Sequence, residues 1–363
     1  MSFDTLIVGS GPAGCLTALE LREHNVMLIE EHSSAGFPVQ CAGLISQDCF
    51  NEYLAYTSKI KKSLIKKVDG AIFFSPNGKF VELEGKSKGV VIERKIFDRI
   101  LLAEASNYVD VLMKTKFDPS MIKNFDYVIG ADGVYSAVSR YFNFKRPQVY
   151  LAVQFECRFE CLDDNMVELY FGKSYSDGFF AYAIPIDGFA RIGVVSKTDP
   201  MFYLNTLLKK HPSVSRRVHS NKITELNVGA IPIGLVEFVR GNVALIGDSA
   251  GMTKPYTGGG LFYLLKAAKI LGKSFPDLDN YLRQYLNLMK KEYEFGMKIL
   301  KLYSGLRDDE FNELVRIGAE YDLKSKMREL NMDEPSTILN VLPLLPKFLR
   351  NFRLAVKILR TML

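Results

Sequence analysis

The first thirty residues combine apolar runs and a glycine-rich turn in an order that predicts strand, turn, helix and strand. The first apolar run is Asp4–Val8, and the turn Gly9–Gly14 (GSGPAG) follows it directly. An Ala- and Leu-rich stretch comes next, and a second apolar run, Val26–Ile29, ends on Glu30. This pattern indicates the first strand–helix–strand unit of a parallel sheet.

Each glycine of the turn has a physical role in holding a dinucleotide. Gly9 permits the tight turn, Gly11 lets the backbone approach a pyrophosphate, and Gly14 lets helix and strand pack closely. The helix N-terminus offers free N–H groups and a positive dipole end to the phosphates. Glu30 has the spacing of a carboxylate that accepts a hydrogen bond from a ribose 2′-OH. An ordinary glycine-rich turn is the alternative, which the acid at the end of the second strand disfavours.

Two later glycine–aspartate turns favour FAD over NAD, which has neither a long polyol nor a ring that becomes anionic. Gly130–Gly133 (GADG) and Gly247–Gly251 (GDSAG) both follow apolar strands, at the edge where open parallel sheets bind ligands. Asp248 can accept a hydrogen bond from a polyol hydroxyl, and Gly258–Gly260 lets backbone lie against a flat ring. The helix beginning at Leu261 points its positive end at that ring and would stabilise a reduced flavin.

The other elements divide the chain into regions. Before residue 147 we expect a loop at 35–46, a helix or helix pair at 51–68, a hairpin at 70–83, a helix after Glu93 and strands at 109–115 and 127–130. From 150 to 195 strands rich in Phe and Tyr alternate without helices, which predicts an antiparallel sheet. A helix at 203–218, strands at 228–232 and 243–246, and a helical remainder follow.

We therefore predict an α/β fold (α+β overall), with a Rossmann-like FAD-binding domain, an inserted antiparallel-sheet substrate domain and a helical C-terminus. The predicted FAD-binding domain is discontinuous and comprises residues 1–68, 88–147 and 226–272. The substrate-binding domain comprises 69–87 and 148–225, and the helical C-terminal region is 273–363.

Composition excludes several classes of protein. Hydrophobic residues make up 48% of the 363 and charged residues 24%, as in soluble globular proteins. No apolar run reaches the ~18 residues that span a bilayer, and no signal peptide precedes the first strand, so we expect a cytoplasmic protein. Five cysteines without a CxxC motif and only four histidines predict neither a disulfide framework nor a metal site, and exclude disulfide-reductase flavoproteins. The net charge of +6 is too small to indicate nucleic acid binding.

The order GSGPAG, GADG, GDSAG and PYTGGG resembles that of flavoproteins with the para-hydroxybenzoate hydroxylase fold. Within that group, PVQCAGLIS (38–46) and KPYTGGGL (254–261) are most similar to the geranylgeranyl reductase family. The resemblance covers about residues 1–271. It implies an FAD-dependent reductase that saturates isolated C=C bonds of isoprenoid chains, including those of archaeal membrane lipids.

The resemblance also implies roles for individual residues. It assigns Ala13 and Glu30 to the adenosine, Cys41 and Ala42 to the isoalloxazine, Arg94 to the phosphates, Phe117 to the adenine pocket, and Asp248, Gly260 and Leu261 to the pyrophosphate and flavin edge. The glycine turns add Gly9, Gly11, Gly14, Asp132 and Gly259 to the predicted cofactor-binding set. Arg94 has a second interpretation, as a capping charge on its own helix.

One family motif departs from its usual form. The pattern aromatic-x-Trp-x-Phe-Pro, then Val-Gly-x-Gly, occurs here as 180–185 and 192–195, with Tyr182 for tryptophan and Val195 for the last glycine. This strand pair is expected to floor the substrate cavity, and a floor changed in this way leaves the accepted chain length open. The predicted pocket residues are Phe171, Phe180, Tyr182, Pro185 and Val195; hydrophobic core is an equal interpretation, because a lipid pocket and a core share one composition.

An isolated alkene is a poor hydride acceptor, so protonation must precede or accompany hydride transfer from the flavin. Aromatic faces can stabilise the resulting positive charge by about 0.5–2 kcal/mol each. Cys41, placed by the loop resemblance, is the candidate catalytic residue near the proton-transfer centre; a small thiol packed beside the flavin is the alternative. NAD(P)H or a carrier such as ferredoxin would supply electrons, and the sequence does not choose between them.

The C-terminal residues 346–363 form an amphipathic pattern. Phe348, Phe352, Ala355, Leu359 and Met362 share one face, and four basic residues lie opposite. Such a helix could make a peripheral contact with the inner face of an anionic membrane. The alternative is a helix packed on the body of the protein with a solvated basic face.

The predicted function is thus FAD-dependent reduction of prenyl double bonds in lipid precursors. A flavin monooxygenase or halogenase of the same fold is the first alternative, although the absence of tryptophan disfavours a halogenase. A flavoprotein that passes electrons to quinone is the second.

Overall fold

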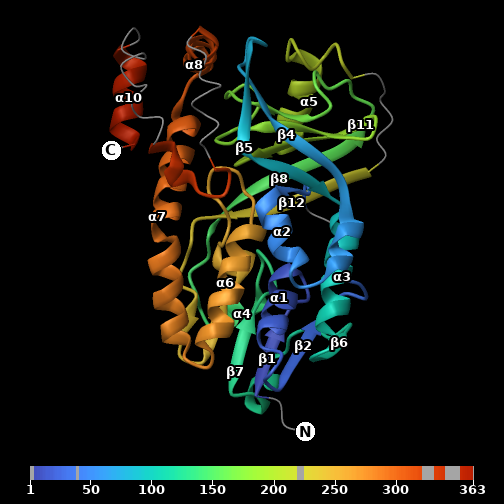
Figure 1. Ribbon diagram of the computed structural model, residues 1–363. Coiled ribbons are helices and arrows are strands. Elements are labelled where there is room, and N and C mark those ends of the chain that lie inside the picture. The colour runs from blue at the N-terminus through green and yellow to red at the C-terminus, as the bar shows by residue number, and fades with distance from the viewer. Residues whose placement is uncertain (1–3, 38–40, 219–224, 321–330, 340–351, 363) are drawn as a thin grey trace.

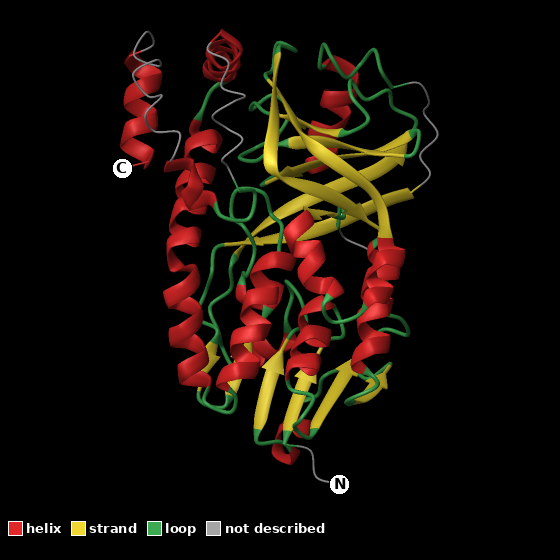
Figure 2. Ribbon diagram, viewed as in Figure 1, coloured by secondary structure: helices red, strands yellow, loops and turns green. Residues whose placement is uncertain are grey.

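The computed structural model describes residues 4–37, 41–218, 225–320, 331–339 and 352–362. Two sheets organise the chain, and helices lie between and beside them (Figures 1 and 2). The parallel strands of the lower sheet point their carboxyl ends toward the upper sheet, so any ligand held at that edge lies between the two sheets (Figure 2).

The lower sheet has six strands in the order β13-β14-β7-β1-β2-β6. The strands are β13 (Val239–Arg240), β14 (Val243–Leu245), β7 (Tyr127–Gly130), β1 (Thr5–Val8), β2 (Val26–Glu30) and β6 (Asp110–Met113). All pair in parallel except β13, which is antiparallel to β14. The short continuous apolar strands at its centre are buried because helices cover the sheet. The Rossmann-like prediction is confirmed.

Three helices of this part follow the glycine turns, namely α1 (Pro12–Glu20), α4 (Ala137–Tyr141) and α6 (Leu261–Ser274). The other two, α2 (Gln47–Leu54) and α3 (Arg94–Ala105), follow strands of the upper sheet. Helix α1 packs between α3 and α6, and almost all of its residues are buried. In α3 the inner face includes the fully buried Phe97, Leu101 and Ala105. The start of α1 is therefore held rigidly at the end of β1.

The upper sheet has eight strands in the order β12-β8-β11-β10-β9-β4-β5-β3. They are β12 (Glu225–Ile233), β8 (Gln148–Cys157), β11 (Phe189–Ser196), β10 (Ala181–Ile186), β9 (Met166–Tyr170), β4 (Leu64–Phe74), β5 (Phe80–Ile92) and β3 (Leu44–Ser46). The predicted hairpin turn at 76–78 joins β4 and β5. One pair, β4 with β9, is parallel, so the expected purely antiparallel sheet is mixed at this junction.

Several predicted elements differ in the structure. Residues 58–63 form a 3-10 helix and β4 begins at Leu64, so the predicted helix or helix pair at 51–68 gives way to a strand over its last five residues. The predicted helix at 203–218 is α5 (Pro200–Lys210), which ends before Pro212. Strand β12 lies in the upper sheet, although most of it falls within the segment 226–272 predicted for the FAD-binding domain. The division of the chain into domains stays a prediction.

The C-terminal region contains three described helices, α7 (Leu278–Gly305), α8 (Asp308–Glu320) and α10 (Phe352–Met362). Helix α7 runs along the molecule beside both sheets, and α10 packs against its upper end (Figure 1). On α10, Leu354, Ala355, Ile358 and Met362 are buried in a cluster shared with α7 and α8. This packing matches the second of the two interpretations of the tail. The membrane contact stays a prediction, and the first residues of the predicted helix, including Phe348, lie outside the described residues.

No helix among the described residues combines the length and the apolar character that crossing a membrane requires. All five cysteines are free thiols. Within the described ranges no three His, Cys, Asp or Glu side chains come together in a group that could hold a metal ion.

A buried polar cluster lies behind the upper sheet. The Arg217 guanidinium donates to both carboxylate oxygens of Glu168 at 2.7 and 2.9 Å, and Glu168 is fully buried. His211 lies beside this cluster with no exposed surface, and its ring contacts Phe74, Tyr170 and Tyr175. The cluster therefore holds one ion pair and one neutral imidazole in an aromatic environment.

His211 should make the protein less stable in mild acid. Burial lowers the pKa of His211 from its ordinary value near 6.5 to about 4, so only the unfolded chain takes up this proton between those values. The contribution of neutral His211 to the free energy of unfolding is intact above about pH 6.5. It is lost as the pH falls toward 4, by at most about 1.4 kcal/mol per pH unit. Urea unfolding of the wild type and of His211→Gln, at neutral pH and near pH 5, should show a flatter pH dependence for the variant. Equal slopes would contradict this assignment.

Candidate functional site

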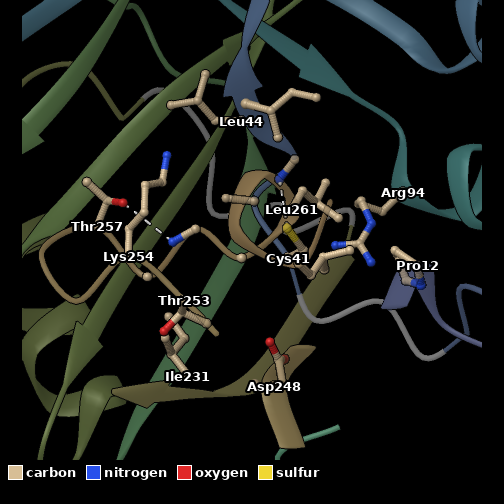
Figure 3. A pocket seen from close by; sticks show the side chains of 18 of the residues that line it. Pro12, Cys41, Leu44, Arg94, Ile231, Asp248, Thr253, Lys254, Thr257 and Leu261 are labelled. Atoms are coloured by element: carbon tan, nitrogen blue, oxygen red, sulfur yellow. Dashed lines mark hydrogen bonds between the residues drawn. The ribbon is translucent and has the colours of Figure 1, made fainter. Parts of the chain in front are cut away.

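A cavity of about 1120 Å³ lies between the two sheets. At its lower end it is lined by residues at the carboxyl ends of β1, β2, β7 and β14, and at its upper end by the inner face of the eight-stranded sheet. Figure 3 shows this wall from close by, with Asp248 pointing into the space from below and Arg94 and Cys41 at one side. The cavity thus joins the two regions that the sequence predicts for cofactor and substrate.

The three glycines of the first turn have different surroundings. Gly9 has φ +100°, and a Cβ there would lie 2.5 Å from the Ala131 carbonyl oxygen. A Cβ on Gly14 would lie 1.8 Å from the Gly9 carbonyl oxygen, so Gly14 permits the close packing of α1 on β1. Around Gly11, by contrast, no atom lies within 4 Å of the Cβ position. The space over the N-terminus of α1 is open toward the cavity, as an approaching pyrophosphate requires.

The Glu30 carboxylate ends β2 at the cavity wall and is 9% exposed. It accepts hydrogen bonds from the Ser10 N–H and hydroxyl at 2.8 and 2.9 Å, and from the His32 N–H at 2.9 Å. Burial raises the pKa of Glu30, but the hydrogen bonds from His32 and Ser10 outweigh it, so the pKa lies below its ordinary value. Glu30 is therefore a negative charge that also ties the glycine turn to β2.

Two aspartates at the cavity keep unsatisfied carboxylate oxygens. Asp132 Oδ2 accepts from the N–H groups of Ala137 and Val138 at 2.6 and 3.2 Å and so caps α4, while the buried Asp132 Oδ1 has no hydrogen-bond partner. The Asp248 carboxylate faces the cavity and bonds to none of the described side chains (Figure 3). Burial raises the pKa of Asp248 to about 6, and the charge of Arg94 offsets only part of this rise. Asp132 Oδ1 and the Asp248 carboxylate can therefore each accept a hydrogen bond from a donor such as a ligand hydroxyl.

Arg94 lies at the start of α3 and makes a bidentate pair with Asp98, with N–O distances of 2.8 and 2.9 Å. Burial lowers the pKa of Arg94, but the paired charge of Asp98 outweighs it and holds the pKa above its ordinary value. The arginine faces Cys41 in the cavity wall (Figure 3). Cys41 Sγ in turn accepts a hydrogen bond from the Gly43 N–H at 3.3 Å. A fixed positive charge therefore lies beside the predicted catalytic thiol.

Arg191, which the sequence did not single out, holds the Cys41 loop in place. It is 5% exposed and donates to the carbonyl oxygens of Ala42 and Ile92 at 3.0 and 3.2 Å. It also pairs with Glu156 and Glu93 at 2.8 and 3.0 Å. The only sequence signal was an arginine within an apolar strand, where a charge requires partners.

The upper arm of the cavity is apolar and aromatic. Phe171, Phe180 and Val195 line it, and Tyr182 lines it with its hydroxyl donating to Gln154 Oε1 at 2.9 Å. The ring of Tyr182 lies over Gly193, where a Cβ would come within 2.4 Å of it. Tyrosine and glycine are therefore matched across β10 and β11. Because the Tyr182 hydroxyl already has a hydrogen-bond partner in Gln154, the arm remains suited to a hydrocarbon chain.

Most of the predicted site residues line this one cavity. They are Gly9, Gly11, Ala13, Glu30, Cys41, Ala42, Arg94, Phe117, Asp132, Asp248, Gly259, Gly260 and Leu261, with Phe171, Phe180, Tyr182 and Val195 in the upper arm. Gly14 lies behind the wall, where it serves packing. Pro185 does not line the cavity, because side chains alternate between the two faces of β10 and Tyr182 and Ile184 occupy the cavity face. Lys254 and Asp333 line it as well, although the sequence did not identify them as site residues.

The chain is similar in sequence to known reductases. No family model matches it. It is 30% identical over 356 residues to the digeranylgeranylglycerophospholipid reductase of Methanococcus vannielii, covering 86% of this chain and 90% of that protein. The reductase of the same name from Methanocaldococcus jannaschii is 28% identical over 93% of this chain and 96% of its own length. An uncharacterized protein of M. jannaschii is 27% identical over 88% of this chain and 89% of its own.

Solved structures share the fold. A geranylgeranyl bacteriochlorophyll reductase-like protein from Thermoplasma acidophilum matches with a TM-score of 0.77 and 21% identity, over 95% of this chain and 99% of that one. The flavin-dependent brominase Bmp2 matches with a TM-score of 0.69 and 14% identity, over 94% of this chain and 98% of the other. These structural similarities establish the architecture of the chain. The function of the site depends on its own residues.

Proposed function

Because this chain belongs to the geranylgeranyl reductase family and is a flavin-dependent oxidoreductase, we propose that it binds FAD and saturates isolated C=C bonds in prenyl chains of archaeal-type membrane lipids or their precursors. The observation that carries the proposal is the continuity of the cavity. Its lower end has the glycine turn, Glu30 and Asp248, and its upper arm is lined by Phe171, Phe180 and Tyr182. One continuous cavity therefore combines a dinucleotide site with an adjoining apolar chamber.

The lower end fits FAD in its donor and acceptor chemistry. The open space at Gly11 and the N–H groups of α1 suit a pyrophosphate. The Asp248 carboxylate and Asp132 Oδ1 would accept from ligand hydroxyls, which relieves their lack of partners. Gly258 has φ +75° and leads into Gly259 and Gly260, a backbone that a flat ring can approach.

When bound, the reduced flavin supplies a hydride, and the protein must supply a proton and tolerate positive charge on the alkene. The Cys41 thiol, held by the Gly43 N–H and facing the cavity, would donate that proton and be reprotonated from solvent. The Phe171 and Phe180 rings would stabilise the positive charge. The hydrogen bond between Tyr182 and Gln154 fixes both side chains in the cavity wall.

Replacing Cys41 by alanine should slow alkene reduction by about 10²–10⁴-fold, the usual contribution of a positioned acid. FAD content should remain normal, since the substitution only removes a sulfur from a half-buried loop. Single-turnover reoxidation of the reduced flavin by the lipid measures this step. Cys161→Ala, at a cysteine outside the cavity, is the matched control. An unchanged rate in Cys41→Ala would remove the thiol from the mechanism.

A monooxygenase or halogenase on the same architecture is the second candidate, since the brominase shares the fold. It would consume O₂ with its reductant in the presence of substrate, whereas the proposed reductase works without oxygen. The experiment is therefore anaerobic. Protein bleached with dithionite should regain its flavin absorbance when a digeranylgeranyl glycerophospholipid is added, and should stay bleached with the fully saturated lipid. Reoxidation that requires O₂ would favour the monooxygenase.

A further inference from the structure

A buried ion pair lies in the cavity wall and is not used by the chemistry above. Lys254 Nζ lies 2.8 Å from Asp333 Oδ1, and the two residues are 5% and 2% exposed. They are separated by 79 positions in the chain. Taking two charges out of water is costly, so such a pair is retained where its geometry is well satisfied or where it has a role.

Lys254 organises the loop that runs along the predicted flavin edge. Its backbone N–H donates to the Gly259 carbonyl oxygen at 2.9 Å, and its carbonyl accepts from the Gly258 N–H at 2.8 Å. Its side chain lies over Gly259, with Cε 2.9 Å and Nζ 3.4 Å from the position of a Cβ there. The ammonium group is therefore fixed directly beside the glycines that would lie against the ring (Figure 3).

Asp333 connects this loop to the strand that follows Cys41. Its second oxygen, Oδ2, accepts a hydrogen bond from the Ser46 hydroxyl, and Ser46 caps α2 by accepting from the Cys49 N–H at 2.9 Å. The neighbouring Met332 carbonyl accepts from Lys254 Nζ at 3.2 Å and from the Tyr256 hydroxyl at 2.6 Å. The segment that contains Met332 and Asp333 thus bonds both the Lys254 loop and the strand that follows the Cys41 loop.

We propose that Asp333 is a positioning residue that acts through Lys254, and that this pair sets the reduction potential of the bound flavin. The proposal rests on flavin binding as proposed above. With both charges present the pair adds no net charge to the wall beside Gly259. A charge left alone there would be weakly screened, because the side chains are buried. Reduction makes the flavin ring more negative, so a lone ammonium favours it and a lone carboxylate opposes it.

The test is the flavin midpoint potential of FAD-loaded variants, measured by anaerobic dye equilibration near pH 7.5. Asp333→Asn should raise the potential and Lys254→Met should lower it. The double variant should lie close to the wild type. If the pair only maintained the shape of the loop, the potentials of both single variants would shift in the same direction or not at all. The double variant would then not return to the wild-type potential.

Lys266→Met is the matched control, because Lys266 lies on α6 outside the cavity in a partly exposed pair with Glu52. Its potential should equal that of the wild type. If one single variant does not fold, the other and the double variant decide. Shifts of equal sign, or a double variant displaced as far as either single one, would overturn the inference. A protein that loads no flavin would instead overturn the proposed function, so the two failures are distinct.

Discussion

Gly11→Asp is expected to give a folded protein that no longer retains FAD. Aspartate is a favourable N-cap and suits φ −65°, ψ 179° at this position, so α1 should form normally. The new carboxylate would occupy the open space above the helix and repel a pyrophosphate. Two like charges 4 Å apart near a protein surface cost about 4 kcal/mol, which corresponds to about a thousandfold weaker binding. FAD titration followed by fluorescence measures the loss.

Gly11→Asn is the matched control, since it has the same shape and capping ability without the charge. It should weaken FAD binding less than Gly11→Asp does, and the thermal unfolding of both apoproteins should resemble the wild type. If Gly11→Asp bound FAD as tightly as the wild type, the pyrophosphate could not lie at the start of α1.

The second large effect is expected on stability, at the cluster behind the upper sheet. Arg217→Met leaves the fully buried Glu168 without its counter-charge, which should lower the free energy of unfolding by about 3–5 kcal/mol. Urea unfolding measures this loss. Arg216→Met, at the exposed neighbour, should stay within about 0.5 kcal/mol of the wild type. Equal, small losses in both variants would show that the ion pair contributes little.

The parts of the fold that local sequence determines could be predicted. The unit from β1 to Glu30 follows from a short apolar strand, a glycine turn and an acid, all within thirty residues. The hairpin of β4 and β5 follows from the turn at 76–78, because Gly78 has φ +83° and few residues accept that conformation. The convergence of the three glycine turns followed from their shared place at strand ends.

Long-range pairing could not be predicted in the same way. The segment Leu64–Val68 has the mixture of lysines and apolar residues that is typical of a helix. Its antiparallel pairing with β5 makes it a strand. Asp333 lies in a segment with no motif, and its role appears only where the fold brings it to Lys254. The upper arm also remained ambiguous, since Phe171 and Phe180 have the composition of a core until the cavity beside them is seen.

The most direct test of the central claim is the mass of the lipid product. Dithionite-reduced, FAD-loaded protein is incubated without oxygen with a digeranylgeranyl glycerophospholipid, and the extracted lipid is analysed by mass spectrometry. The account predicts the gain of two hydrogens for each double bond reduced, in the prenyl chains and not in the headgroup. Unchanged lipid mass from protein that holds reduced FAD would contradict it.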